Sequence, residues 1–129
     1  MGGGVKLFKS YRDDYQDGGQ LRDFVYVKDI CRAIQYVIEN SHVNGLYNLG
    51  TGNARSFYDL ALAVFKAMGV KPQIEWIDMP VQLQRTYQYY TRAEMDKFRE
   101  AGFEEPFYRL EDGVADYVQN YLLEGYKIY

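Results

Sequence analysis

The chain has 129 residues, 47% of them hydrophobic and 26% charged, which is usual for one globular domain and excludes a disordered or collagen-like chain. A net charge of −3 argues against nucleic-acid binding, because domains that bind nucleic acids carry an excess of Lys and Arg. The longest apolar run, residues 60–65, is too short to cross a membrane, and the single Cys excludes an internal disulfide.

The first third of the chain predicts two strands and a helix. Residues 6–9 read as a short strand, and the polar residues 10–20 read as a loop. Residues 24–27 (FVYV) favour a second strand. Asp29 then stands where an N-cap is expected, and apolar residues at helical spacing predict an amphipathic helix over 30–40.

The middle of the chain predicts another strand and another helix. Residues 46–49 (LYNL) read as a short buried strand that ends in a glycine-rich turn. Ser56 and Asp59 have the spacing of a capping box. They predict a helix over 57–68, which Gly69 closes.

The last third predicts a strand followed by two helices. Residues 74–77 read as a strand, and Thr91 with Glu94 forms a second capping box for a helix over 92–101. A final helix is expected from Leu110 to about Gly125. This alternation predicts an α/β fold with a small, mainly parallel sheet and about four helices.

Few residues suggest catalysis by themselves. His42 reads as a solvated loop residue and Cys31 as a small buried hydrophobe, and one His with one Cys leaves no zinc cluster. The turn 50–52 (GTG) lacks the further glycine of a dinucleotide fingerprint, because residue 55 is Arg. Its backbone amides could still face a ligand.

Two segments are candidates for binding. Arg22, directly before an apolar run, suits bidentate recognition of phosphate, although an ion pair with Asp23 at a strand end is the simpler interpretation. Residues 84–90 (QRTYQYY) could stack on a base or a sugar and bind hydroxyl groups. A strand with Tyr87 and Tyr89 on one face explains the same pattern.

These segments carry a family resemblance. Residues 22–29 (RDFVYVKD) and 47–52 (YNLGTG) resemble the C-terminal half of extended short-chain dehydrogenase/reductases, the family of nucleotide-sugar epimerases and dehydratases. Three further stretches, 6–10 (KLFKS), 85–91 (RTYQYYT) and 101–103 (AGF), are similar to the ADP-heptose 6-epimerases of that family. The resemblance extends from about residue 5 to about residue 123.

The resemblance implies a place in a larger enzyme. In this family an ADP-sugar lies between an N-terminal Rossmann domain and a smaller C-terminal domain, so residues 5–129 are expected to be the C-terminal substrate-binding domain, without the Rossmann domain. Residues 1–4 are expected to be a cloning remnant or a cut loop. The implied substrate-binding residues are Phe8, Lys9, Ser10 and Tyr11 along the sugar nucleotide, Arg22 at the diphosphate and Tyr87 as a late contact. Lys9, Ser10 and Tyr11 differ from the family pattern.

The resemblance also implies what the chain does not contain. The family's glycine-rich cofactor turn and its Tyr-x-x-x-Lys signature are both absent, so no catalytic, cofactor-binding or metal residues are expected. The parent enzyme is implied to be cytoplasmic and to invert C6 of ADP-heptose with NADP, for lipopolysaccharide core synthesis. The chain is expected to be inactive alone and to self-associate through the faces of 30–40 and 46–49 that would pack on the Rossmann domain.

Three other functions are alternatives. A UDP-hexose 4-epimerase or another epimerase or dehydratase of the same family would differ in its nucleotide preference. A stand-alone binding module would use the tyrosine-rich surface without a partner domain. RNA binding through stacked aromatic residues fits poorly, because Asp and Glu outnumber Lys and Arg.

Overall fold

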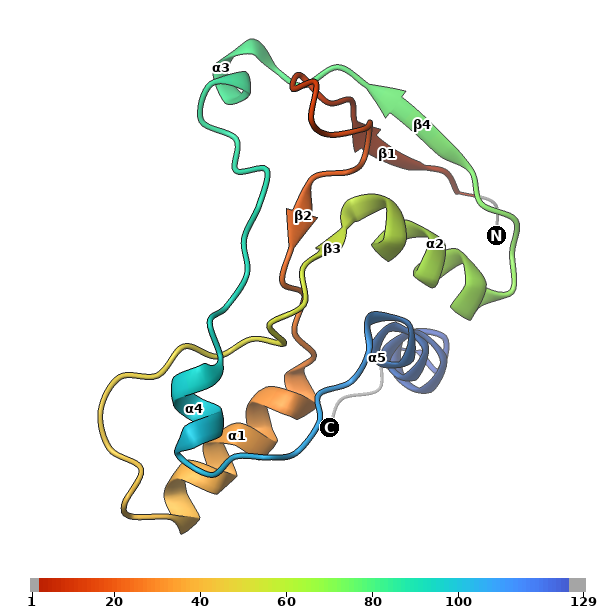
Figure 1. Ribbon diagram of the computed structural model, residues 1–129. Helices are drawn as coiled ribbons and strands as arrows, with labels where there is room; N and C mark the ends of the chain where they lie inside the picture. Colours follow the sequence, from red (N-terminus) through yellow and green to blue (C-terminus); the bar gives the residue numbers. More distant parts are fainter. Residues whose placement is uncertain (1–2, 126–129) are drawn as a thin grey trace.

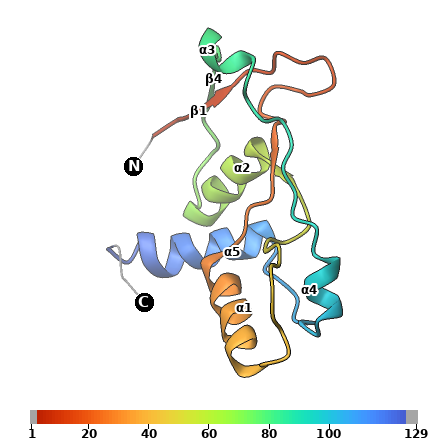
Figure 2. The ribbon, with the colours of Figure 1, turned by 90° about the vertical axis from the view of Figure 1, so that its left-hand side faces the viewer.

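The computed structural model describes residues 3–125 as an elongated arrangement of helices and a few short strands. Figure 1 shows two strands at one end, two helices side by side at the other end, and two further helices packed together between them. Figure 2, turned by 90°, shows the same order along the molecule. The elements are β1 (Val5–Phe8) and β4 (Ile74–Ile77) at the first end, α1 (Val27–Glu39) and α4 (Asp96–Glu100) at the other, and α2 (Phe57–Met68) and α5 (Leu110–Tyr117) between them.

The sheets are small. β1 and β4 pair in parallel, with Val5 opposite Ile74, and the amide of Lys9 extends the pairing by donating to the carbonyl oxygen of Ile77 at 2.9 Å. The predicted α/β fold with a small parallel sheet is therefore confirmed. Two shorter strands, β2 (Leu21–Arg22) and β3 (Arg55–Ser56), pair antiparallel in the middle of the molecule.

The helix α2 has the boundaries that its sequence predicts. The amide of Asp59 donates to Oγ of Ser56 at 2.9 Å, and the amide of Ser56 donates back to the Asp59 carboxylate at 3.3 Å. Gly69 ends the helix with φ of 69°, a left-handed conformation that glycine adopts without steric cost. Both ends follow from short-range interactions, which is why the local pattern was sufficient.

The helix α1 begins earlier than predicted. It starts at Val27, so residues 24–27 do not form a strand, and Tyr26 rather than Asp29 is the N-cap. Asp29 lies inside the first turn and is completely buried. It accepts a hydrogen bond from the amide of Tyr108 at 2.9 Å and pairs with Arg32. Asp29, which was expected to be the N-cap, instead lies buried and links α1 to the segment before α5 by its hydrogen bond with Tyr108.

The helix predicted over 92–101 is shorter in the structure. α4 spans Asp96–Glu100 and has no side-chain cap, because Glu94 pairs with Arg92 at 2.5 Å instead of forming a capping box. The amide of Thr91 donates to the carbonyl oxygen of Leu21 at 3.2 Å. Pairing with β2 therefore holds the preceding residues extended and delays the helix. A short helix α3 (Val81–Gln84) was not predicted.

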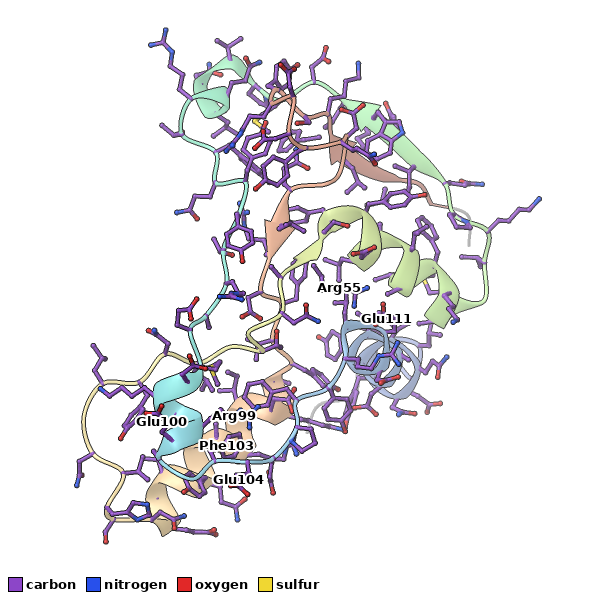
Figure 3. All side chains as sticks on the ribbon, viewed as in Figure 1. Arg55, Arg99, Glu100, Phe103, Glu104 and Glu111 are labelled. Atoms are coloured by element: carbon purple, nitrogen blue, oxygen red, sulfur yellow. The ribbon has the colours of Figure 1, made fainter. Side chains whose placement is uncertain are left out.

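The final helix forms much as expected. α5 continues from Tyr117 into a π-helical turn, η1 (Val118–Leu122). Gly113 lies inside α5 where a Cβ atom would be 3.3 Å from the ring of Tyr26, so a small residue is needed for this packing. Arg55 and Glu111 face each other between α2 and α5, and two hydrogen bonds of 2.5 and 3.1 Å join them (Figure 3).

Residues 46–49 do not form the predicted strand. Among residues 3–125, no strand pairs with this segment, and Leu46 is 85% exposed. The segment nevertheless contributes to a core around α1 and α4, because Tyr47 and Leu49 pack against it. The buried members of that core are Ala33, Val43, Met95, Phe98 and Phe103. None of the helices in the described part of the chain has the length and apolar character needed to span a membrane.

Candidate nucleotide-sugar site

The candidate site is built around β2, which has a neighbouring segment on each side. On one side the backbone of Arg22 lies opposite that of Arg55 in the antiparallel pairing with β3. On the other side the amide of Leu21 donates to the carbonyl oxygen of Tyr89 at 2.8 Å. This pairing brings Arg22 and Tyr87, which are far apart in the sequence, onto adjacent stretches of backbone.

The guanidinium group of Arg22 lies over two aromatic rings. Its central carbon lies 5.3 Å from the ring centroid of Tyr87 and 5.5 Å from that of Phe57. One N–H group donates to the carbonyl oxygen of Leu21 at 2.8 Å, and this is the one hydrogen bond of this side chain within residues 3–125. Stacking fixes the plane of a guanidinium and leaves its N–H edge available, which is the arrangement that suits a phosphate.

Aromatic contacts extend from Tyr87 to the end of β1. The Tyr87 ring lies edge-on to Phe8, with centroids 5.9 Å apart, and edge-on to Tyr89 at 5.8 Å. The hydroxyl of Tyr89 accepts a hydrogen bond from the amide of Tyr11 at 2.9 Å. The structure therefore brings four of the six predicted residues together: Phe8, Tyr11, Arg22 and Tyr87.

Lys9 and Ser10 lie beside this cluster and have partners of their own. The Lys9 ammonium pairs with Asp78 at 3.1 Å, and the hydrogen bond to that carboxylate raises the pKa of Lys9. The amide of Ser10 donates to Asp17 at 2.7 Å, and its hydroxyl donates to the carbonyl oxygen of Arg12 at 2.9 Å. These contacts order the loop, but they do not direct the two side chains toward Arg22.

Tyr89 belongs to the candidate segment 84–90 but is not one of the six implied substrate-binding residues, and the structure places it beside them. It is 5% exposed, it contacts Tyr87, and the guanidinium of Arg12 lies 5.3 Å from its ring centroid. The alternation of Tyr87, Gln88 and Tyr89 predicted that both tyrosines share one face, and that signal could have identified Tyr89. Its role is to support the loop that carries Tyr11.

The glycine-rich turn does not offer its amides to a ligand. The amides of Thr51 and Gly52 both donate to the carboxylate of Asp23 at 2.9 Å. The ion pair between Arg22 and Asp23 that was the simpler interpretation does not form, since Asp23 binds the turn and Arg22 stacks on rings. Hydrogen bonds to Thr51 and to backbone amides outweigh the effect of burial and lower the pKa of Asp23.

The remaining candidates from the sequence are His42, Cys31 and possible metal ligands. His42 is exposed and contacts the carbonyl oxygen of Ala101 at 3.2 Å, as expected for a loop residue. The prediction that Cys31 is buried is wrong, because it lies on the exposed face of α1. No group of three or more potential metal ligands occurs among residues 3–125. A cavity of about 510 Å³ lies elsewhere, between Tyr26 and Tyr117, and none of the six predicted residues lines it.

Comparison with known proteins shows what the chain is similar to. Residues 5–50 match the NAD dependent epimerase/dehydratase family. Two curated ADP-L-glycero-D-manno-heptose-6-epimerases, from Nitratidesulfovibrio vulgaris strain DP4 and Fusobacterium nucleatum, are 52% identical over 120 residues and 48% identical over 126 residues. Over nearly its whole length the chain is similar to part of these ADP-L-glycero-D-manno-heptose-6-epimerases. The resemblance inferred from the sequence is thereby confirmed.

The match covers nearly all of this chain but a minor part of each relative. Both alignments include 93% of the chain, which corresponds to 37% and 38% of the two relatives. These proportions are consistent with a C-terminal portion of such an enzyme.

Solved structures agree with this assignment. The ADP-L-glycero-D-manno-heptose-6-epimerase of Helicobacter pylori matches with a TM-score of 0.70 and 28% identity, over 91% of this chain and 32% of that chain. The UDP-glucose 4-epimerase of Thermus thermophilus, in complex with NAD, matches with a TM-score of 0.67 and 24% identity, over 87% of this chain and 33% of that chain. At that identity the second likeness concerns the fold alone.

Proposed function

We propose that this chain is the substrate-binding part of an ADP-L-glycero-D-manno-heptose 6-epimerase. Two curated relatives with that name share about half of their residues with it over the matched region, at 52% and 48% identity. The observation that carries the proposal is the guanidinium of Arg22, which lies over the rings of Phe57 and Tyr87 and makes one hydrogen bond within residues 3–125, to the carbonyl oxygen of Leu21. Such a group binds a diphosphate with good geometry.

The roles proposed for the site residues follow the geometry. Arg22 binds the diphosphate, and Tyr87 contacts the substrate beside it. Phe8 and Tyr11 line the sugar nucleotide next to Tyr87, while Lys9 and Ser10 line its further part from the same loop. An exposed Tyr11, 45% accessible, offers a flat surface of the kind on which a base can stack.

The chemical step belongs to another part of the enzyme. In the proposed parent enzyme NADP supplies the transient oxidation and re-reduction at C6 of the heptose. Within residues 3–125 the glycine-rich turn 50–52 does not fit a nicotinamide dinucleotide, because the amides of Thr51 and Gly52 are bound to Asp23. The chain therefore binds and orients substrate, and it is inactive by itself.

The exposed face of α1 is the proposed contact with the remainder of the parent enzyme. Val27, Ile34 and Ile38 share one side of this helix and are 47%, 52% and 77% exposed. Leu46, on the extended segment that lacks a partner strand among residues 3–125, is 85% exposed. We propose that an N-terminal Rossmann domain covers this surface, and that without it the chain self-associates. We place the parent enzyme in the cytoplasm.

Titration with nucleotides tests the proposal. The chain is titrated by calorimetry with ADP, ADP-heptose, UDP and dTDP, alone and with the N-terminal part of the Nitratidesulfovibrio vulgaris relative supplied in trans. The expected result is a preference for the ADP ligands and tighter binding when the N-terminal part is present. A preference for UDP would assign the chain to a UDP-sugar enzyme. Tight binding whose affinity is the same with and without the supplied N-terminal part would favour a stand-alone binding module.

A further inference from the structure

The carboxylate of Asp23 joins three segments of the chain beside Arg22. One oxygen accepts hydrogen bonds from the amide and the hydroxyl of Thr51, and the other accepts from the amides of Gly52 and Ala93, at 2.9 and 3.0 Å. Thr51 and Gly52 precede β3, and Ala93 follows the segment that pairs with β2. Asp23 thus ties together the two neighbours of the strand that carries Arg22.

The carboxylate of Asp23 occupies space that a side chain at position 50 would otherwise fill. A Cβ atom on Gly50 would lie 2.7 Å from Oδ2 of Asp23 and 2.7 Å from Cβ of Ala93. Cβ atoms essentially never make contacts this short, so a side chain at residue 50 would displace the carboxylate or the segment that it holds. Glycine at position 50 and aspartate at position 23 are therefore parts of one arrangement, although 26 residues separate them.

The same hydrogen bonds also stabilise the negative charge of Asp23, which lies next to Arg22 in the sequence. A carboxylate next to a phosphate-binding arginine would repel the anion and attract the guanidinium. Four donors directed at Asp23 stabilise its charge locally. The guanidinium of Arg22 lies over the rings of Phe57 and Tyr87 and donates to the carbonyl oxygen of Leu21 rather than to this carboxylate.

We infer that Asp23 is a positioning residue for the anion-binding group of Arg22: its carboxylate holds β2, the turn before β3 and the segment after Tyr89 in the register that places Arg22 against Tyr87. This inference rests on the proposed binding of an ADP-sugar, and it adds a residue that acts through Arg22 without contacting the ligand.

The test measures ADP affinity by calorimetry with the complete chain. Asp23→Asn preserves the shape of the side chain but turns one acceptor into a donor, and Gly50→Ala pushes the carboxylate out. Thr51→Val removes the hydroxyl that donates to Asp23 and that also accepts from the amide of Asn53 at 3.0 Å. Asp112→Asn is the charge control, since Asp112 is exposed on α5. We expect Asp23→Asn and Gly50→Ala to weaken ADP binding about tenfold, with a smaller loss for Thr51→Val, and Asp112→Asn to bind as the wild type does.

A double substitution separates positioning from a general structural effect. If Asp23 acts through Arg22, adding Asp23→Asn to Arg22→Ala causes no further loss of ADP affinity. Additive losses, or wild-type affinity in Asp23→Asn, would overturn the inference while leaving the proposed function intact. If the wild-type chain does not bind ADP, or binds it equally well without Arg22, the proposed function and this inference fall together. If circular dichroism shows Asp23→Asn unfolded, the additivity test is made with Thr51→Val.

Discussion

Arg22→Ala should remove most of the affinity of the chain for ADP. The guanidinium has five N–H donors, of which the described part of the chain engages one. A hydrogen bond between charged groups contributes about 1.5–3 kcal/mol, so the loss corresponds to roughly 10- to 150-fold weaker binding. Arg22→Lys keeps the charge but loses the planar fork and the stacking, so we expect about tenfold weaker binding.

The assay is calorimetric titration of each folded variant with ADP. The two aromatic contacts of Arg22 at 5.3 and 5.5 Å also stabilise the fold, so thermal unfolding is measured in parallel, with an expected loss of about 1–2 kcal/mol. Arg109→Ala is the control, since its side chain is 75% exposed and lies on the N-cap of α5. Equal ADP affinity of Arg22→Ala and the wild type would refute the assignment of Arg22 to the diphosphate.

Three further predictions concern Tyr87, Glu111 and Ile38. Tyr87→Phe should weaken ADP-heptose binding by about 1 kcal/mol, the contribution of one neutral hydrogen bond, because the ring that stacks on the guanidinium is retained. Arg55 lowers the pKa of Glu111 to about 2, so this pair should stabilise the fold by about 1 kcal/mol at neutral pH relative to Glu111→Gln, with the difference measured by thermal unfolding. Because the folded-state pKa lies below the ordinary value of 4.5, that advantage is lost as the pH falls from 4.5 toward 2. Ile38→Lys should reduce self-association of the chain in analytical ultracentrifugation, since Ile38 is 77% exposed on the α1 face.

Each of these predictions has a control and a contrary result. For Tyr87, unchanged affinity would place its hydroxyl outside the site. For Glu111, a stability difference that persists below pH 2 would mean that burial rather than the ion pair is responsible. For Ile38, the control is Val81→Lys on α3, where Val81 is 78% exposed at the other end of the molecule. A wild-type chain that is monomeric at all concentrations would contradict the proposed exposed interface.

Elements whose ends depend on nearby residues were predictable from the sequence. The capping box of Ser56 with Asp59 and the left-handed Gly69 define α2 completely. The residues 74–77 form β4 as their apolar character indicated. The family resemblance of residues 22–29 and 47–52 could also be recognised from the sequence alone, because both segments keep a characteristic pattern.

Contacts between distant segments decided the rest. Residues 91–94 have a capping pattern, but the amides of Thr91 and Ala93 are held by hydrogen bonds to Leu21 and Asp23. Residues 46–49 have the character of a strand, yet a strand needs a neighbour, and none lies beside them among residues 3–125. The stacking of Arg22 on Tyr87 likewise joins residues on separate segments. Local propensity is weaker than a set of long-range hydrogen bonds, so only the tertiary structure shows which pattern prevails.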